Sequence, residues 1–344
     1  MKTGSGTGRP ALRAAMAALC AGLLLAAPAL AQPAAVAGAS AKPLRLIVPF
    51  PAGGAIDTLA RSIAQQATGP LGQTVVIDNR PGAGGIIGME ACARATADGQ
   101  TVCLATGEHM AFNPSLFPAL PYDPVQSFAP VIRLVRIEGV IIAGAASRID
   151  SMAKLIEMAR ERPGAINWAS YGPASSPHLY MEWIARRAGV TITHVPYKGS
   201  AQTIPALLAD EAQVSYVALG FVLPQLRTGR LRALATATPK RLAQIPDVPT
   251  LAELGLDPGF DNWAGLFVPA GTPRSAVDRL NVGFNRALAD PGLAERVLAA
   301  QGYEPVGGSQ EAFAGFVAGE RAVAKRVVAE TGISHPEAGS PGVR

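Results

Sequence analysis

Short apolar segments that alternate with glycine-rich turns and helical repeats constrain this fold more than any other feature. Residues 44–48 form a strand-length apolar run, and a Pro/Gly turn separates it from apolar residues at helical spacing over 56–67. A second strand, a loop, a second helix and a third strand follow at residues 75–77, 82–88, 89–95 and 101–105. This order predicts a parallel sheet with right-handed crossovers and helices on both faces. We therefore predict doubly wound α/β architecture.

The pattern resumes near residue 140 with different loops. Strands are predicted at residues 140–143, 166–169, 191–195, 214–218 and 231–236, with a helix opened by Ser151 and further helices at 179–188 and 203–209. A last strand at 263–268 precedes helices at 273–289 and 309–330, the latter with Ser309 as its N-cap and Gly332 at its end. We predict a discontinuous first lobe, residues 42–139 and 263–334, and a second lobe, residues 140–262.

The first 31 residues have the composition of a secretory signal peptide. Lys2, Arg9 and Arg13 precede an apolar run over residues 14–27, and small residues flank Leu30. A basic start, a short apolar run and a small-x-small site predict export, with cleavage after Ala31. The expected location is the periplasm.

Two other interpretations of the leader are less favourable. Lipid attachment at Cys20 would need a small residue before it, and Leu19 is bulky. The apolar run is also shorter than the roughly 20 residues that a membrane-spanning helix requires. We expect a soluble mature chain, long enough for two domains.

The charge balance does not favour a nucleic-acid partner. The formal net charge is +5, but three of the cations belong to the predicted leader. Aromatic residues make up only 6% of the chain, and no cluster of lysine or arginine alternates with them as a single-strand groove requires. A mixed, solvated surface is the better interpretation.

Two cysteines follow the predicted leader, Cys92 in a predicted helix and Cys103 in the next strand. An oxidising compartment permits a disulfide between them. Two separate buried thiols fit the pattern as well, because free cysteine packs like a small apolar residue. No CxxC occurs and the chain has only four histidines, so we predict no metal site.

The segment VPFPAGGAID places Gly53 and Gly54 between the end of a strand and the start of a helix. Free backbone amides and the helix dipole favour an anion there, so the turn fits a carboxylate. A strand-to-helix turn that needs glycine only for its backbone angles is the alternative.

Enzymatic interpretations have less support. In RPGAGGIIG the glycines resemble a dinucleotide fingerprint, but Ile87 takes the place of the third glycine and the loop follows the second strand. No GxSxG is present. His109, His178 and His194 lack an evident nucleophile nearby in sequence and are interpreted as structural. An exported enzyme remains a second class of function.

Six motifs together point to a family. They are VPFPAGGAID, DNRPGAGG, FNPSLFPALPYDP, HVPYKGSAQ, LRTGRLRALA and IPDVPTLAELG. In this order, from Lys42 to about Gly332, they resemble the Bug-type (TctC-like) receptors of tripartite tricarboxylate transporters. The resemblance implies a type II periplasmic binding protein fold, with two α/β lobes joined by two crossing strands that close on a small carboxylate like a Venus flytrap. It also implies a monomer without cofactor that delivers its ligand to the membrane components of such a transporter.

The resemblance places the ligand-binding residues on loops that follow strand carboxyl ends. On the first lobe they are Pro51, Ala52, Gly53, Gly54, Ala55, Thr106, Gly107, Glu108 and His109. On the second lobe they are Ser170, Gly172, Ser175, Ser176, His178, Lys198, Gly199 and Ser200. Ser175, Ser176 and Lys198 are the foremost polar contacts, although a solvated turn lysine explains Lys198 equally well.

Three departures from the family pattern bear on the ligand. Glu108 would repel an anion if it faced the cleft, or pair with an ammonium or ring nitrogen; an outward-facing acid is the favoured interpretation. Val217 replaces a frequent aspartate, which makes that wall more apolar. Tyr171 and Pro173 are larger or less polar than usual and favour a smaller cleft or a flat aromatic ligand. A dicarboxylate, an amino acid or a pyridine carboxylate therefore fits better than citrate.

The resemblance leaves the biological role open between two receptor functions. An uptake receptor passes its ligand to a transporter, whereas a periplasmic sensor passes the occupancy of its site to a signalling partner. In both, donors from the two lobes must bind the ligand better in the closed state than in the open one.

Overall fold

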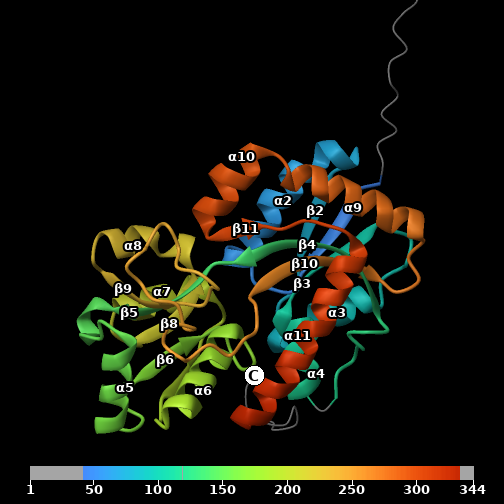
Figure 1. The fold of residues 1–344 in the computed structure, drawn as a ribbon. Coiled ribbons are helices and arrows are strands. Elements are labelled where there is room, and N and C mark those ends of the chain that lie inside the picture. The colour runs from blue at the N-terminus through green and yellow to red at the C-terminus, as the bar shows by residue number, and fades with distance from the viewer. Residues whose placement is uncertain (1–41, 118, 334–344) are drawn as a thin grey trace, which may run out of the picture. The chain divides into compact units, whose positions relative to one another are not determined.

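The computed structural model describes residues 42–117 and 119–333. These residues form two sheets that are covered by helices (Figure 1). The first sheet has the strand order β11-β4-β10-β3-β1-β2, and the second has the order β7-β6-β8-β5-β9. The predicted signal peptide and Cys20 lie outside the described residues.

The first sheet is built from both ends of the described chain. Its strands are β1 (Leu44–Val48), β2 (Val75–Asn79), β3 (Thr101–Thr106), β4 (Phe128–Ile137), β10 (Trp263–Pro269) and β11 (Tyr303–Pro305). The helices of this lobe are α2 (Ala55–Leu71), α3 (Ile86–Ala93), α4 (Asn113–Leu116), α9 (Arg274–Leu288), α10 (Pro291–Leu293) and α11 (Gln310–Thr331).

The second sheet is built from the middle of the chain. Its strands are β5 (Gly139–Gly144), β6 (Asn167–Ser170), β7 (Thr193–Pro196), β8 (Val214–Ala218) and β9 (Leu231–Thr236). Its helices are α5 (Met152–Glu161), α6 (Ser176–Ala188), α7 (Ser200–Leu208) and α8 (Leu223–Arg227). Apolar residues buried against Trp168 fill the core of this lobe.

Both sheets are mixed, so the prediction of a parallel sheet was wrong for part of each. β1 pairs in parallel with β2 and β3, but β10 is antiparallel to β3 and β4. In the second sheet β5 is antiparallel to β8 and β9. The reason is connectivity: β4 leaves the first sheet and β10 returns to it, so these neighbours run in opposite directions.

Strands β4 and β11 were not predicted from the sequence. In β4, Pro130, Arg133 and Arg136 interrupt the apolar run that marks a buried strand. The two arginines bind one carboxylate: Arg133 Nη2 and Arg136 Nε donate to Asp261 Oδ2 at 2.6 Å and 3.0 Å. Asp261 lies two residues before the start of β10, so these ion pairs join the two segments that cross between the lobes.

Cys92 and Cys103 form a disulfide that joins α3 to β3, with Cα atoms 6.2 Å apart. The sequence left this bond and two free thiols as alternatives, and the packing of α3 on β3 decides between them. Both residues are fully buried within an apolar cluster that also contains Ile47 and Phe267.

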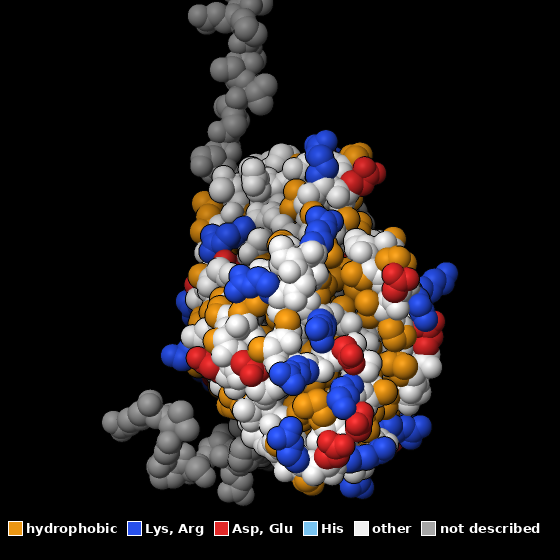
Figure 2. All heavy atoms as spheres, turned by 90° about the vertical axis from the view of Figure 1, so that its left-hand side faces the viewer, with side chains coloured by type: hydrophobic (Ala, Val, Ile, Leu, Met, Phe, Trp, Pro, Cys, Tyr) orange, Lys and Arg blue, Asp and Glu red, His pale blue; other side chains and the backbone are white. Residues whose placement is uncertain are grey.

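The surface shows charges of both signs. Figure 2 shows lysine and arginine interspersed with aspartate and glutamate on the side of the molecule that carries α5 and α8. Across residues 42–117 and 119–333, none of the helices combines the length and apolar character that crossing a membrane demands.

Candidate functional site

Four strands end in loops that carry the predicted binding residues. The loops follow β1 and β3 in the first sheet, and β6 and β7 in the second. β1 runs parallel to β3, and β6 runs parallel to β7, so each pair of loops emerges at the same edge of its sheet. In open α/β sheets this edge is where ligands bind.

The turn before α2 is held by a buried carboxylate. Gly53 has a positive φ of +80°, which disfavours other residues, and its N–H donates to Asp57 Oδ2 at 2.8 Å. Asn79 Nδ2 and Arg61 Nε also donate to Asp57, at 2.8 Å and 2.9 Å. Burial acts to raise the pKa of Asp57, but these hydrogen bonds and Arg61 hold it below its ordinary value. Asp57 therefore stays ionised and fixes the turn.

Asp57 was not among the predicted site residues. It is the third residue of α2, a position at which an acid commonly binds the free amides of a helix start. The motif VPFPAGGAID contained that signal.

His109 is a buried, neutral side chain that shapes the loop after β3. Its Nδ1 accepts a hydrogen bond from Thr106 N at 3.1 Å, so Nε2 carries the proton. Burial lowers the pKa of His109 to about 3. The ring lies edge-on to Phe50 at 5.3 Å and against Gly85, where a Cβ atom would collide with it. The requirement for glycine at position 85 follows from this contact and from its φ of +83°.

Glu108 reaches from the first lobe to the second, so the interpretation of an outward-facing acid was wrong. Its Oε1 accepts hydrogen bonds from Ser176 N at 2.5 Å and from Ser176 Oγ at 2.6 Å. Thr106 Oγ1 contacts Oε2 at 3.4 Å. Ser176 is the first residue of α6, whose free amides attract an anion. Packing between the lobes, which the local sequence does not encode, sets this orientation.

A second contact joins the starts of two helices across the lobes. Ala55 N, at the start of α2, donates to Ser200 Oγ, at the start of α7, at 3.3 Å. On the other side of Ala55, its carbonyl oxygen accepts a hydrogen bond from Tyr303 Oη at 2.9 Å. Lys198 is exposed, and its ammonium group has no partner among the described residues. This agrees with the interpretation of Lys198 as a solvated turn lysine.

The loop after β6 is held by neutral groups. Ser170 is fully buried; its Oγ lies 2.5 Å from His194 Nε2 and accepts a hydrogen bond from Gly172 N at 3.0 Å. Ser175 Oγ donates to Gly172 O at 2.6 Å. Burial, and then the neighbouring His178, lower the pKa of His194 to about 4. No nucleophile lies near His194 in sequence; its hydroxyl partner, Ser170, is distant in sequence but adjacent in the sheet.

His178 stacks on His194 with ring centroids 4.1 Å apart. Its Nδ1 accepts a hydrogen bond from Ala174 N at 3.2 Å, and its Nε2 lies 3.4 Å from Glu182 Oε1. Both nitrogens are thereby engaged in holding the loop before α6. This arrangement agrees with the structural role expected for His178.

Among the described residues, hydrogen bonds across the lobes connect only part of the predicted set: Ala55 with Ser200, and Glu108 with Ser176. Other predicted residues support these loops from within their own lobe, namely Thr106, His109, Ser170, Gly172, Ser175 and His178. The same turns also contain Pro51, Ala52, Gly54, Gly107 and Gly199. Of the turn before α2, Ala52 and Gly53 are exposed. Val217, the predicted apolar wall, is buried in the core of the second lobe, and Tyr171 Oη donates to Tyr216 O at 2.9 Å.

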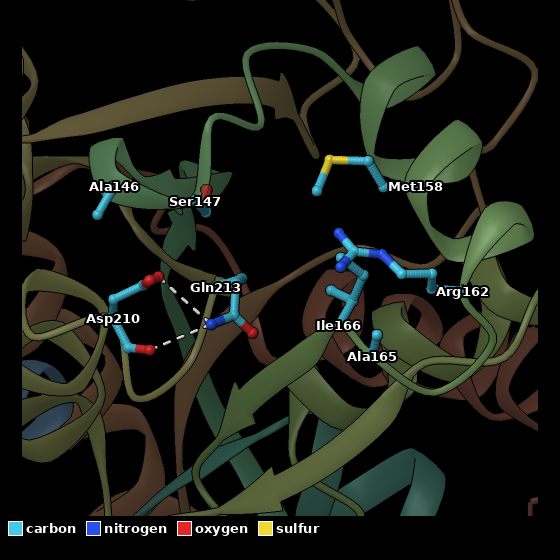
Figure 3. Close-up of a pocket in the computed structure, with 8 residues that line it drawn as sticks. All are labelled: Ala146, Ser147, Met158, Arg162, Ala165, Ile166, Asp210 and Gln213. Atoms are coloured by element: carbon cyan, nitrogen blue, oxygen red, sulfur yellow. Dashed lines mark hydrogen bonds between the residues drawn. The ribbon is translucent and has the colours of Figure 1, made fainter.

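A pocket of about 220 Å³ lies elsewhere on the second lobe (Figure 3). Its lining comes from the short 3-10 turn after β5, the last turns of α5 and the residue after it, the residues before β6 and the loop before β8, namely Ala146, Ser147, Met158, Arg162, Ala165, Ile166, Asp210 and Gln213. It contains none of the predicted binding residues. It lies by the amino ends of β6 and β8, the sheet edge opposite to the loops that follow β6 and β7.

Comparison with known proteins decides the family. The family model of the tripartite tricarboxylate transporter family receptor matches residues 59–333. The chain belongs to this receptor family. Protein BugT of Bordetella pertussis is 36% identical over 314 residues, which cover 90% of this chain and 96% of BugT.

Several solved structures are similar to this chain in both sequence and fold. Rpa4515 of R. palustris, solved with adipate, is 34% identical, with a TM-score of 0.79 over 85% of this chain and 97% of that one. MatC of Rhodopseudomonas palustris, solved with bound malate, is 30% identical, with a TM-score of 0.77 over 83% and 98%. These likenesses confirm the predicted two-lobed periplasmic binding protein fold and the family resemblance.

Proposed function

We propose that this chain is a periplasmic receptor that binds a small carboxylate between its two lobes and delivers it to the membrane components of a tripartite transporter. The proposed lobes are residues 42–139 with 263–334 and residues 140–262. The proposed binding surface is formed by the loops after β1, β3, β6 and β7. Export by the leader, with cleavage after Ala31, is part of this proposal.

One observation carries the proposal: the amino ends of helices from both lobes meet. The start of α2 contacts the start of α7 through Ala55 and Ser200, and the start of α6 binds a carboxylate, that of Glu108. Helix amino ends favour anions, and donors from two lobes make affinity depend on closure. The adipate and malate with which two related structures were solved support a carboxylate ligand.

The affinity required is within reach of such donors. Micromolar binding corresponds to about 8 kcal/mol, and each hydrogen bond to a charged group contributes roughly 1.5 to 3 kcal/mol. Four or five backbone and hydroxyl donors around one carboxylate are therefore sufficient.

The test is a thermal-shift screen of the mature protein against mono-, di- and tricarboxylates, amino acids and pyridine carboxylates. A ligand that binds only the folded state stabilises it by mass action and therefore raises Tm. At a ligand concentration of 100 times Kd, the free energy of unfolding rises by about 2.7 kcal/mol. We expect a saturable rise with one chemical class. Folded protein, freed of co-purified ligand, that shows no shift with any class would contradict the proposal.

The contact between Ser170 Oγ and His194 Nε2 favours a second candidate, an exported hydrolase, because it has the geometry of a nucleophile and its base. Ser170 is fully buried and also accepts the Gly172 amide, which places it away from substrate. The two functions differ in turnover. A hydrolase would convert a bound ester or amide and lose this activity in Ser170→Ala, whereas a receptor returns its ligand unchanged.

A sensing role would use the same site. It differs from uptake in the partner that reads the closed state, and growth on the identified ligand after deletion of the gene separates the two. Loss of growth supports uptake.

A further inference from the structure

Glu108 places a carboxylate of the protein where a ligand anion would otherwise bind. Its Oε1 accepts hydrogen bonds from both the amide and the hydroxyl of Ser176 at the start of α6. These are the donors that a carboxylate ligand would use on the second lobe. A ligand with carboxylates at both ends would bring its second negative charge next to Glu108.

The Glu108 carboxylate has no counter-ion in the described part of the chain. Its neighbours there are the hydroxyl groups of Thr106 and Ser176, and no lysine, arginine or histidine forms an ion pair with it. His109, the next residue, is neutral and engaged with Thr106. An unpaired, desolvated carboxylate is costly, and burial raises the pKa of Glu108.

The carboxylate can still accept a ligand group. Glu108 is half-buried rather than fully buried, and Oε2 has only the 3.4 Å contact with Thr106. An ionised carboxylate offers about four acceptor positions, so Oε2 keeps free capacity. Tyr171 lies close enough to Glu108 to be affected by its charge. Burial is the main cause that raises the pKa of Tyr171, and the negative charge of Glu108 is the second.

We propose that Glu108 makes this receptor selective for a zwitterion, a ligand with one carboxylate and one protonated nitrogen. The nitrogen donates to Glu108, and the carboxylate binds at the starts of α2 and α7, by Ala55 and Ser200. This inference rests on the proposed function and names the ligand class of the same site.

The test uses calorimetric titration with three probes of equal chain length: 5-aminopentanoate, pentanoate and glutarate, together with the four- and six-carbon series. For the wild-type protein we expect the amino acid of at least one series to bind about 10-fold or more tightly than the matched diacid, because the diacid faces Glu108 with a like charge. The simple monoacid should lie between them. This comparison needs no variant.

Glu108→Gln keeps the size of the side chain and removes its charge. We expect it to lose most of the 10-fold preference, whereas Glu157→Gln, a carboxylate on α5 that pairs with Lys154 at 2.9 Å, keeps it. Wild-type protein that binds glutarate or adipate as tightly as the amino acid, with the ratio unchanged in Glu108→Gln, overturns the inference and leaves the proposed function standing. If neither protein binds any carboxylate of the thermal-shift panel, both fall.

Discussion

In the first lobe the groups that hold the binding loops are buried, whereas in the second lobe the corresponding histidines are partly open to water. Asp57 and His109 are exposed by 2% and 1%, while the His178 side chain is 12% exposed and His194 is half-buried. The first lobe also uses an ionised carboxylate, and the loop before α6 is held by hydroxyl and imidazole groups.

This difference implies that removing one of these groups lowers the free energy of unfolding more in the first lobe than in the second. A buried group that loses its partner cannot turn to water for a replacement, but a half-exposed one can. The first lobe should therefore be the rigid side of the site and the second lobe the more tolerant one. Three experiments, ordered by expected effect, compare the two lobes.

Acidification should separate the lobes most clearly. His109 has a folded pKa of about 3 against an ordinary 6.5, so the unfolded state binds the extra proton between these values. Its contribution to stability is complete above pH 6.5 and falls by about 3 kcal/mol down to pH 4. The window for His194 is narrower, from 6.5 to about 4, so the two histidines differ mainly below pH 4, where only the contribution of His109 continues to fall.

Urea unfolding at pH 7 and pH 3 measures this loss in the wild type, in His109→Gln and in His194→Gln. We expect the loss on acidification to shrink more in His109→Gln than in His194→Gln. Equal losses in the wild type and His109→Gln would contradict the assigned burial of His109.

Asp57→Ala should have the next largest effect, about 2 kcal/mol at pH 7, because it leaves the Gly53 amide and Asn79 without their acceptor. Asp78→Ala is the matched control: Asp78 pairs with Arg45 and Arg80 but is 30% exposed, so its loss should cost about 1 kcal/mol or less. Chemical unfolding of both variants checks the difference. Equal costs would mean that the turn before α2 is not held by Asp57.

Ser170→Ala should cost the least, about 1 kcal/mol, because His194 is half-buried and the Gly172 carbonyl keeps its hydrogen bond from Ser175, which leaves the Gly172 amide as the main group without a partner. Ser62→Ala, which removes a hydroxyl bonded to Thr58 O within α2, serves as control and should stay within about 0.5 kcal/mol of wild type. Tm shifts report both. A Ser170→Ala cost above that of Asp57→Ala would reverse the proposed order of the lobes.

Much of the fold could be predicted because the spacing of apolar residues and the residues at helix ends indicate helices and strands locally. The apolar periodicity over residues 56–67 predicted the buried face of α2, and Ser309 with Gly332 marked the ends of α11. Strand β4 escaped because Pro130, Arg133 and Arg136 resemble an exposed segment. The partner that explains both arginines, Asp261, lies far away in sequence.

The site was predicted in part for the same reason. The turn at Gly53 and the loop at Ser175 have local signatures, since glycine and serine are the residues that strand-to-helix turns require. Asp57 was missed although its position at the helix start is also a local signal. The partners Ser170 and His194 could not be paired from the sequence, because only the adjacency of β6 and β7 brings them together.

The sequence by itself determined the α/β class, the order of its helices and strands and the family, because these depend on spacing and on motifs within short segments. The tertiary structure decided the mixed direction of the sheets, the disulfide between Cys92 and Cys103, and the direction of Glu108. Each of these depends on contacts between segments distant in sequence. A local pattern of residues does not encode which distant donor a side chain will meet.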